Sequence, residues 1–231
     1  MRWTVRLSLL ASLAFAAPVA AAPVLDSRPA EDAVLSTDPD GPFWQSIAGI
    51  VADGDTFGTP RPELHTEIRS RWSAEHLYLL FICRYDRLNL KPDPDPAHET
   101  PHLWDWDVAE AFIAGDPAHL ERYREFELSP QGEWVDLAID PQVSRWGDPG
   151  WNSGFTVAAR IDAKRHIWYG AMAIPWSALT DAPPKAGLEL RANFFRIQGP
   201  SPDRALIAWQ ATGKLTFHVP EAFGVLRLTG E

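Results

Sequence analysis

Tryptophan gives the clearest chemical signal in this sequence, because several of its 11 copies lie in segments rich in Asp, Pro, Gly and Asn. The copies in these loop-like segments are Trp104, Trp106, Trp146 and Trp151. A ring on a polar loop offers a flat apolar surface, so these residues predict a ligand with flat apolar faces. The tryptophans that we assign instead to core or hairpin packing are Trp72, Trp134, Trp168 and Trp176.

Polar partners for such a ligand are found in one strand-like run. Arg191 and Asn193 are two residues apart, so their side chains share one face of a strand and form a pair of hydrogen-bond donors. A solvent-facing strand surface would give the same pattern. A ligand-binding pair and a solvent-facing surface both require the two side chains to lie on the same face of the strand.

Acidic residues at tight turns suggest a metal ion as a second possible ligand. Asp53 and Asp55 flank Gly54, and hard oxygen ligands on a tight turn suit calcium. An ordinary acidic turn is the alternative. The seven His residues show no spacing typical of a zinc site.

The elements that must position these residues are short strands. Turn residues separate ten strand-like segments, at 64–72, 76–85, 107–115, 122–130, 133–140, 154–162, 166–174, 188–197, 205–210 and 224–229. Short helical turns are expected from Pro175 and over Pro220–Phe223. We therefore predict an all-β fold, an antiparallel two-sheet β-sandwich of jelly-roll type with short helical turns.

Alternation within one segment also assigns faces. In 122–129 the side chains of Tyr123, Glu125 and Glu127 point one way and those of Phe126 and Leu128 the other. The single Cys83 excludes an internal disulfide, and its apolar surroundings predict a core position.

The first residues predict export. Arg2 and Arg6 precede an apolar run of about 11 residues and then small residues, as in a secretory signal peptide with cleavage after Ala21. The run is too short for the ~20 residues of a membrane span. We expect one mature domain over 22–231, monomeric and either periplasmic or extracellular.

The charge of the mature chain limits its partners. Without residues 1–21 it carries 19 basic and 31 acidic residues, a net charge of −12. This excess repels phosphate backbones, so nucleic acid is a poor partner, whereas a neutral glycan meets no such penalty.

Seven short motifs, in order along the chain, resemble carbohydrate-binding module family 9 and family-9-like exported proteins. Each motif alone is a weak signal, and their common order makes the resemblance strong. Two of them are the Trp-Asp-Trp-Asp-Val-Ala-Glu-Ala-Phe-Ile run at 104–113 and the Tyr-Arg-Glu-Phe-Glu-Leu-Ser-Pro-Gln-Gly run at 123–132. The others are Asp40–Trp44, Arg71–Leu79, Ile174–Trp176, Arg191–Arg196 and Phe223–Leu226.

The resemblance implies a non-catalytic sandwich that binds neutral plant-type glycans or oligosaccharides, similar to cellulose or xylan, between two aromatic rings. Trp104 matches the first ring and Glu110 a carboxylate that accepts sugar hydroxyl groups. Arg191 and Asn193 match polar contacts. The second ring falls near Phe217, with Trp106 and Trp209 as alternatives. Structural calcium occurs in some members of the family.

Two other functions remain open from the sequence. Glu110, Glu125, Glu127 and Asp136 supply carboxyl groups for a glycoside hydrolase, which needs two of them about 5–10 Å apart. A haem-binding sandwich would need His or Met ligands. Met172 is the one Met after residue 21, and its apolar strand predicts core packing.

Overall fold

Strands make up nearly all of the regular structure in the computed structural model, which describes residues 22–148 and 150–230. The strands are β1 Val24–Pro29, β2 Ile50–Ala52, β3 Gly54–Asp55, β4 Thr66–Trp72, β5 His76–Arg84, β6 Val108–Ala114, β7 Tyr123–Leu128, β8 Trp134–Asp140, β9 Ser144–Asp148, β10 Thr156–Asp162, β11 Ile167–Pro175, β12 Glu189–Gln198, β13 Ala205–Ala208 and β14 Gly224–Leu228. The short helices are η1 Pro62–Leu64, η2 Leu103–Asp105, α1 Trp176–Leu179 and η3 Pro220–Ala222.

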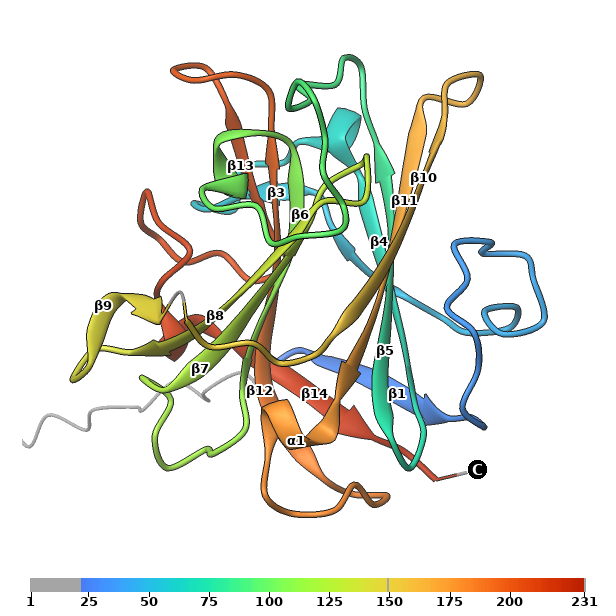
Figure 1. Cartoon of the computed structure of the whole chain (residues 1–231), viewed down its shortest axis with the longest axis vertical. Helices are drawn as coiled ribbons and strands as arrows, with labels where there is room; N and C mark the ends of the chain where they lie inside the picture. Colours follow the sequence, from blue (N-terminus) through green and yellow to red (C-terminus); the bar gives the residue numbers. More distant parts are fainter. Residues whose placement is uncertain (1–21, 149, 231) are drawn as a thin grey trace, which may run out of the picture.

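The strands form two layers that face each other (Figure 1). One layer has the order β10-β11-β5-β4, and the other has the order β14-β12-β6-β7-β8-β9. β1 pairs in parallel with both β14 and β4, so it joins the two layers along one side. The predicted sandwich is confirmed, and β1 is the exception to its antiparallel pairing.

All ten predicted strand segments are present. The sequence reading missed β1, β2, β3 and β9, of which β2 and β3 are only three and two residues long. The predicted turn at Pro220 is η3, whereas Pro175 ends β11 and precedes α1 instead of starting it.

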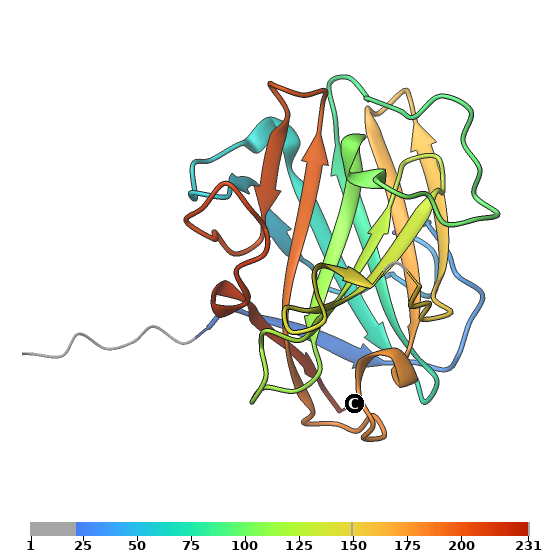
Figure 2. The same cartoon turned by 60° about the vertical axis from the view of Figure 1, so that its left-hand side comes forward.

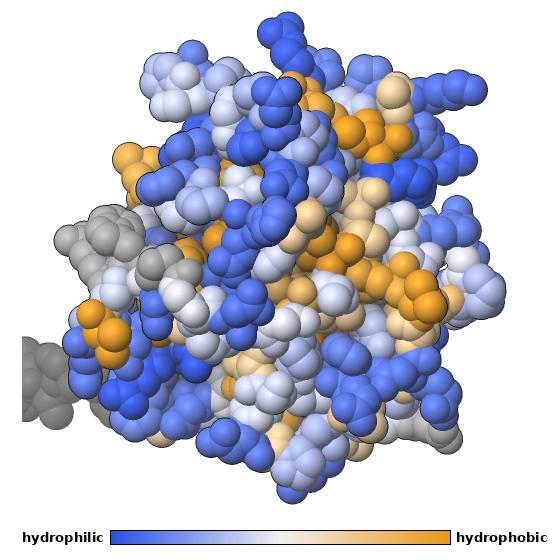
Figure 3. Space-filling view, viewed as in Figure 1, coloured by the Kyte–Doolittle hydropathy of each residue, from blue (hydrophilic) through white to orange (hydrophobic). Residues whose placement is uncertain are grey.

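The main core lies between the layers, where inward-facing side chains of both sheets meet. Phe81 of β5 packs edge to face on Phe194 of β12, with ring centroids 6.2 Å apart. Cys83 and Met172 are fully buried in the same cluster, as predicted. In Figure 3 apolar side chains gather between the two layers on one face of the molecule, with hydrophilic side chains around them.

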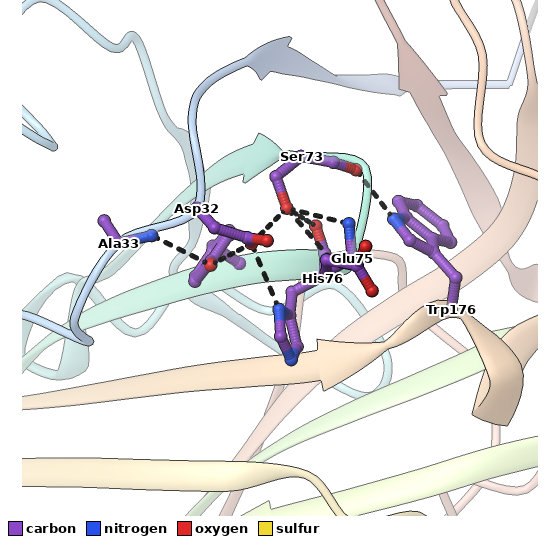
Figure 4. Close-up of polar contacts among 7 residues, drawn as sticks. Asp32, Ala33, Ser73, Glu75, His76 and Trp176 are labelled. Carbon is purple, nitrogen blue, oxygen red and sulfur yellow. Dashed lines mark hydrogen bonds and ion pairs between the residues drawn. The ribbon is translucent and has the colours of Figure 1, made fainter.

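A polar network fixes the segment after β1 to the turn between β4 and β5 (Figure 4). Asp32 Oδ1 accepts the Ser73 hydroxyl at 2.6 Å and the Tyr78 hydroxyl at 2.7 Å, and it lies 3.2 Å from His76 Nδ1. These donors lower the pKa of Asp32, with the Ser73 hydrogen bond as the main cause. Trp176 Nε1 donates to the Ser73 carbonyl oxygen at 3.0 Å, which ties α1 to the same turn.

The longest of these helices, α1, has four residues. Within the described ranges, then, none is long and apolar enough to cross a membrane.

Candidate functional site

A second apolar cluster covers the outer face of the β12-β6-β7-β8 sheet, away from the main core. It contains Phe112, Tyr123, Leu137 and Phe195, each buried and each at alternate positions to the residues that face the core. Above this cluster lies a cavity of about 1260 Å³. Its volume exceeds the ~300–1,000 Å³ typical of small-molecule pockets.

Three segments build the walls of this cavity above the sheet. They are the stretch around η2, the β8–β9 turn with β9, and the segment between β13 and η3, and they contribute Trp104, Pro141 and Phe217 respectively. Figure 2 shows this side of the sheet with the red segment after β13 at the left and yellow β9 in front. Residues far apart in the sequence therefore meet at one site.

Three glutamates converge on the floor of the cavity. Glu110 on β6 pairs directly opposite Glu127 on β7, and Glu125 is two residues away on the same face of β7. One carboxylate oxygen from each lies within 4.8 Å of the other two, and Glu110, Glu125 and Glu127 are only 2%, 4% and 0% exposed.

Burial and mutual repulsion disfavour the charged form of these carboxyl groups. Burial raises the pKa of Glu110 and of Glu127 well above the ordinary range, and a neighbouring glutamate of the cluster raises each further. Burial also raises the pKa of Glu125 to about 7. The cavity therefore has an acidic floor that gains from a proton or a cation.

The two predicted ring residues both line the cavity. Trp104 is partly buried in η2 and makes an edge-to-face contact with His102, at 4.9 Å between ring centroids. Phe217 stacks on Phe195 at 4.2 Å with an interplanar angle of 13°. One face of Phe217 is therefore covered by protein, and a ligand could stack only on the opposite face.

Arg204 links the wall of the cavity to its floor. Its Nη1 donates to the Trp104 carbonyl oxygen at 2.8 Å, which holds η2 in place. Its positive charge also acts against the rise in the pKa of Glu110. Sequence reading did not single out Arg204, because it lies in a Pro-Asp-Arg turn with no strand pattern.

Tyr123 and His218 form a second polar contact in the cavity wall. The Tyr123 hydroxyl lies 2.6 Å from His218 Nδ1, which joins β7 to the segment before η3. Burial lowers the pKa of His218 and raises that of Tyr123, so both groups are neutral at neutral pH.

Trp104, Glu110 and Phe217 thus come together at one cavity, while the other predicted sugar-contacting residues lie elsewhere. Arg191 donates to the carbonyl oxygens of Phe223 and Gly224. Asn193 is fully buried and exchanges hydrogen bonds with the backbone of Gln210. Both are on the face of β12 that carries Phe195, but neither they nor Trp106 line the cavity.

The remaining candidate rings also have structural contacts. Trp209 packs against Phe194 at 5.6 Å, and the guanidinium of Arg124 lies 4.9 Å from the ring of Trp151. Both rings border the main core. The Trp146 side chain lies outside the described residues.

The acidic turn at 53–55 has a clear local role. Asp55 Oδ1 accepts the backbone N–H groups of Phe57 and Thr59 at 2.8 and 2.9 Å, and these bonds help to lower the pKa of Asp55. Asp53 and Asp55 belong to no group of three converging ligand atoms in the described part of the chain. The turn therefore offers calcium fewer ligands than the glutamate cluster does.

Comparison with family models identifies the class of protein that this fold and cavity represent. Residues 42–231 match the model of the carbohydrate family 9 binding domain-like family. The chain belongs to this family, as the sequence motifs predicted.

Individual proteins are also similar to this chain in sequence or in fold. An extracellular protein of Arthroderma benhamiae is 27% identical over 194 residues, which cover 78% of this chain and 84% of that protein. A family 9 carbohydrate-binding module from Caldicellulosiruptor kristjanssonii, solved with cellotriose, has the same fold, with a TM-score of 0.65 at 13% identity over 90% of this chain and 95% of that one. A carbohydrate-binding protein described as putative, from Bacteroides uniformis, has a TM-score of 0.69 at 15% identity over 91% of this chain and all of the other.

Proposed function

We propose that the cavity above β6, β7 and β8 binds a neutral glycan, such as a cellulose- or xylan-like oligosaccharide, and that the protein catalyses no reaction on it. The observation that carries this proposal is the meeting of Trp104, Glu110 and Phe217 at one cavity. An aromatic ring stacks on the CH-rich face of a pyranose, and a carboxylate accepts its hydroxyl groups. Solved family members in complex with cellotriose and with glucose support this chemistry.

The charges around the cavity favour a neutral sugar over an acidic one. Its lining includes Glu121 and Glu221, together with Glu99 and the three floor glutamates, whose pKa values are raised, against Arg204 and Lys214. A uronic acid would meet net repulsion from this surface. Neutral oligosaccharides are therefore the proposed class.

Export of the protein is part of the same proposal. The leader-like residues 1–21 and the extracellular relative both support a site outside the cytoplasm. Polysaccharide substrates of this class are also found there, so location and ligand agree.

Isothermal titration calorimetry with cellotriose, xylotriose and glucose tests the proposal. We expect one binding site, with affinity for at least one trisaccharide that falls about 30-fold in Trp104→Ala, because truncating an aromatic anchor costs about 2 kcal/mol or more. Trp106→Ala is the matched control, since Trp106 is two residues away and outside the cavity. Parental affinity in Trp104→Ala, or loss of binding only in Trp106→Ala, would overturn the assignment of this cavity.

Hydrolysis of a bound glycan is a second candidate, because the cavity floor holds carboxyl groups with raised pKa values. Product analysis after long incubation with xylan and cellulose decides between the two. A product whose formation is abolished in Glu110→Gln would replace the binding-only function, whereas a binding module gives no product.

A further inference from the structure

The glutamates on the cavity floor have fewer donors than the other buried acids of the described residues. Asp107 accepts the backbone N–H groups of Asn89 and Gly199 at 2.9 and 2.6 Å. Asp136 accepts the backbone N–H and the hydroxyl of Ser153 through Oδ2, and Glu133 accepts the Ser129 hydroxyl through Oε2, while the other oxygen of each has no hydrogen-bond partner. The fold thus supplies at least one donor to each of these three acids.

Among the described residues, no comparable donors reach the glutamate cluster. Both carboxylate oxygens of Glu127 and Oε2 of Glu125 are buried without a hydrogen-bond partner. No ion pair in the described ranges includes any of the three glutamates. Arg204, the cation whose charge acts on Glu110, donates to the Trp104 carbonyl oxygen. Because a buried carboxylate without donors is costly, the cluster needs either protons, one of which Glu127 can donate to Glu125, or a bound cation.

We propose that Glu110, Glu125 and Glu127 together bind one divalent cation, with calcium preferred over magnesium. One carboxylate oxygen from each of the three glutamates lies within 4.8 Å of the other two. Two oxygens bound to one Ca²⁺ at about 2.3–2.6 Å can be up to about 5 Å apart, whereas Mg²⁺ at about 2.0–2.1 Å allows only about 4 Å. A separation of this size suits the longer Ca²⁺–oxygen bonds better than the shorter Mg²⁺–oxygen bonds.

The cation would also take part in glycan binding, a step that rests on the proposed function. Three carboxylates provide three to six oxygens, and Ca²⁺ takes about 6–8, so coordination positions remain on the side of the cavity. Trp104 and Phe217 line that same cavity. Two neighbouring hydroxyl groups of a sugar stacked on either ring can complete the coordination. A calcium ion thus couples the acidic floor to the aromatic walls.

Calorimetry on metal-stripped protein tests cation binding directly. We expect one site for CaCl₂ and weaker binding of MgCl₂, with a rise in melting temperature on adding Ca²⁺. Glu127→Gln and, separately, Glu125→Gln keep the shape of the side chain but should lower Ca²⁺ affinity at least about 10-fold, since even the loss of a ligand's supporting contact costs about 10–100-fold. The control is Glu189→Gln, which changes an exposed acid of β12.

The variants also separate a cation site from a merely structural role. In metal-free buffer Glu127→Gln should melt at a higher temperature than the parent, because it removes a carboxyl group that is costly to bury whether it is ionised or has to take up a proton, while the rise caused by Ca²⁺ becomes smaller. A parent that binds no Ca²⁺, or a Glu127→Gln variant and a Glu125→Gln variant that both bind it as the parent does, overturns the proposal.

Titration of the oligosaccharide in Ca²⁺ and in EDTA distinguishes the failure of this inference from the failure of the proposed function. Sugar affinity that is higher in Ca²⁺ supports both. Ca²⁺ binding with no sugar binding in either buffer supports the cation site and removes the glycan function. Equal sugar affinity in both buffers keeps the glycan function and overturns the role of the cation in it.

Discussion

Single side chains in the cavity depend on contacts that lie partly outside it. Arg204 illustrates this, because one hydrogen bond to the Trp104 carbonyl oxygen fixes the short helix that presents the ring. The side chain also brings a positive charge toward Glu110 on the floor. Arg204 is therefore a positioning residue for the proposed sugar site.

Removing that contact should weaken glycan binding. We expect Arg204→Met to lower affinity for the bound oligosaccharide about 10-fold, because a hydrogen bond from a charged donor contributes about 1.5–3 kcal/mol. Arg204→Lys should recover part of the loss, since Lys keeps the charge and a donor. Calorimetry measures the affinity of both variants. Arg227→Met is the control, because Arg227 of β14 forms an exposed ion pair with Asp26 of β1. Unchanged affinity in Arg204→Met would show that Trp104 is held by other contacts.

For single residues, the sequence predicted the strand face on which a side chain lies better than it predicted the contacts of that side chain. Alternation correctly placed Glu125 and Glu127 on one side of β7, and Arg191 and Asn193 on one side of β12. It could not place Glu110 opposite Glu127, because that pairing depends on the register set by the connection between β6 and β7. Nor could it show that Arg191 and Asn193 donate to backbone carbonyl groups, of Gly224 at the start of β14 and of Gln210 after β13 respectively.

Among the elements, β1 connects the two layers. It pairs with β14 in one layer and β4 in the other, and Ser27 Oγ accepts a hydrogen bond from Ser70 Oγ at 2.8 Å where both residues are buried. Ser27 pairs with Leu228, which is 201 residues away in the sequence, and local patterning cannot reveal such a pairing. The longer strands were predictable because each carries its own apolar alternation, which the two or three residues of β3 and β2 are too short to show.

Two neighbouring residues of β1 provide a matched test of this role. Leu25 is 1% exposed and packs in the main core, whereas Val24 is 37% exposed. Leu25→Ala should lower the free energy of unfolding by about 2–5 kcal/mol, and Val24→Ala by no more than about 0.5 kcal/mol. Urea titration followed by Trp fluorescence measures both. Equal effects of the two substitutions would contradict the view that β1 closes the core between the layers.

For the whole molecule, acidity shapes both partner choice and the response to pH. The sequence carries 31 acidic and 21 basic residues, and several acids are buried or crowded in the fold. Glu99, on the rim of the cavity, is one whose pKa rises to about 7, mainly through burial and then through Asp136 beside it. Its Oε1 lies 3.5 Å from Asn152 Nδ2.

The pH dependence of stability should therefore contain a contribution from Glu99. Its pKa is higher in the folded protein, about 7, than the ordinary value of 4.5, so the folded state binds this proton more tightly. The stabilisation is full below pH 4.5 and is lost as the pH rises through 7. We expect the melting temperature to fall between pH 5.5 and 8, with a smaller fall in Glu99→Gln, which cannot ionise. Scanning calorimetry of both proteins at these pH values in EDTA isolates this contribution, because the other acids are common to both. If the two curves run parallel across this range, Glu99 does not change its protonation on unfolding.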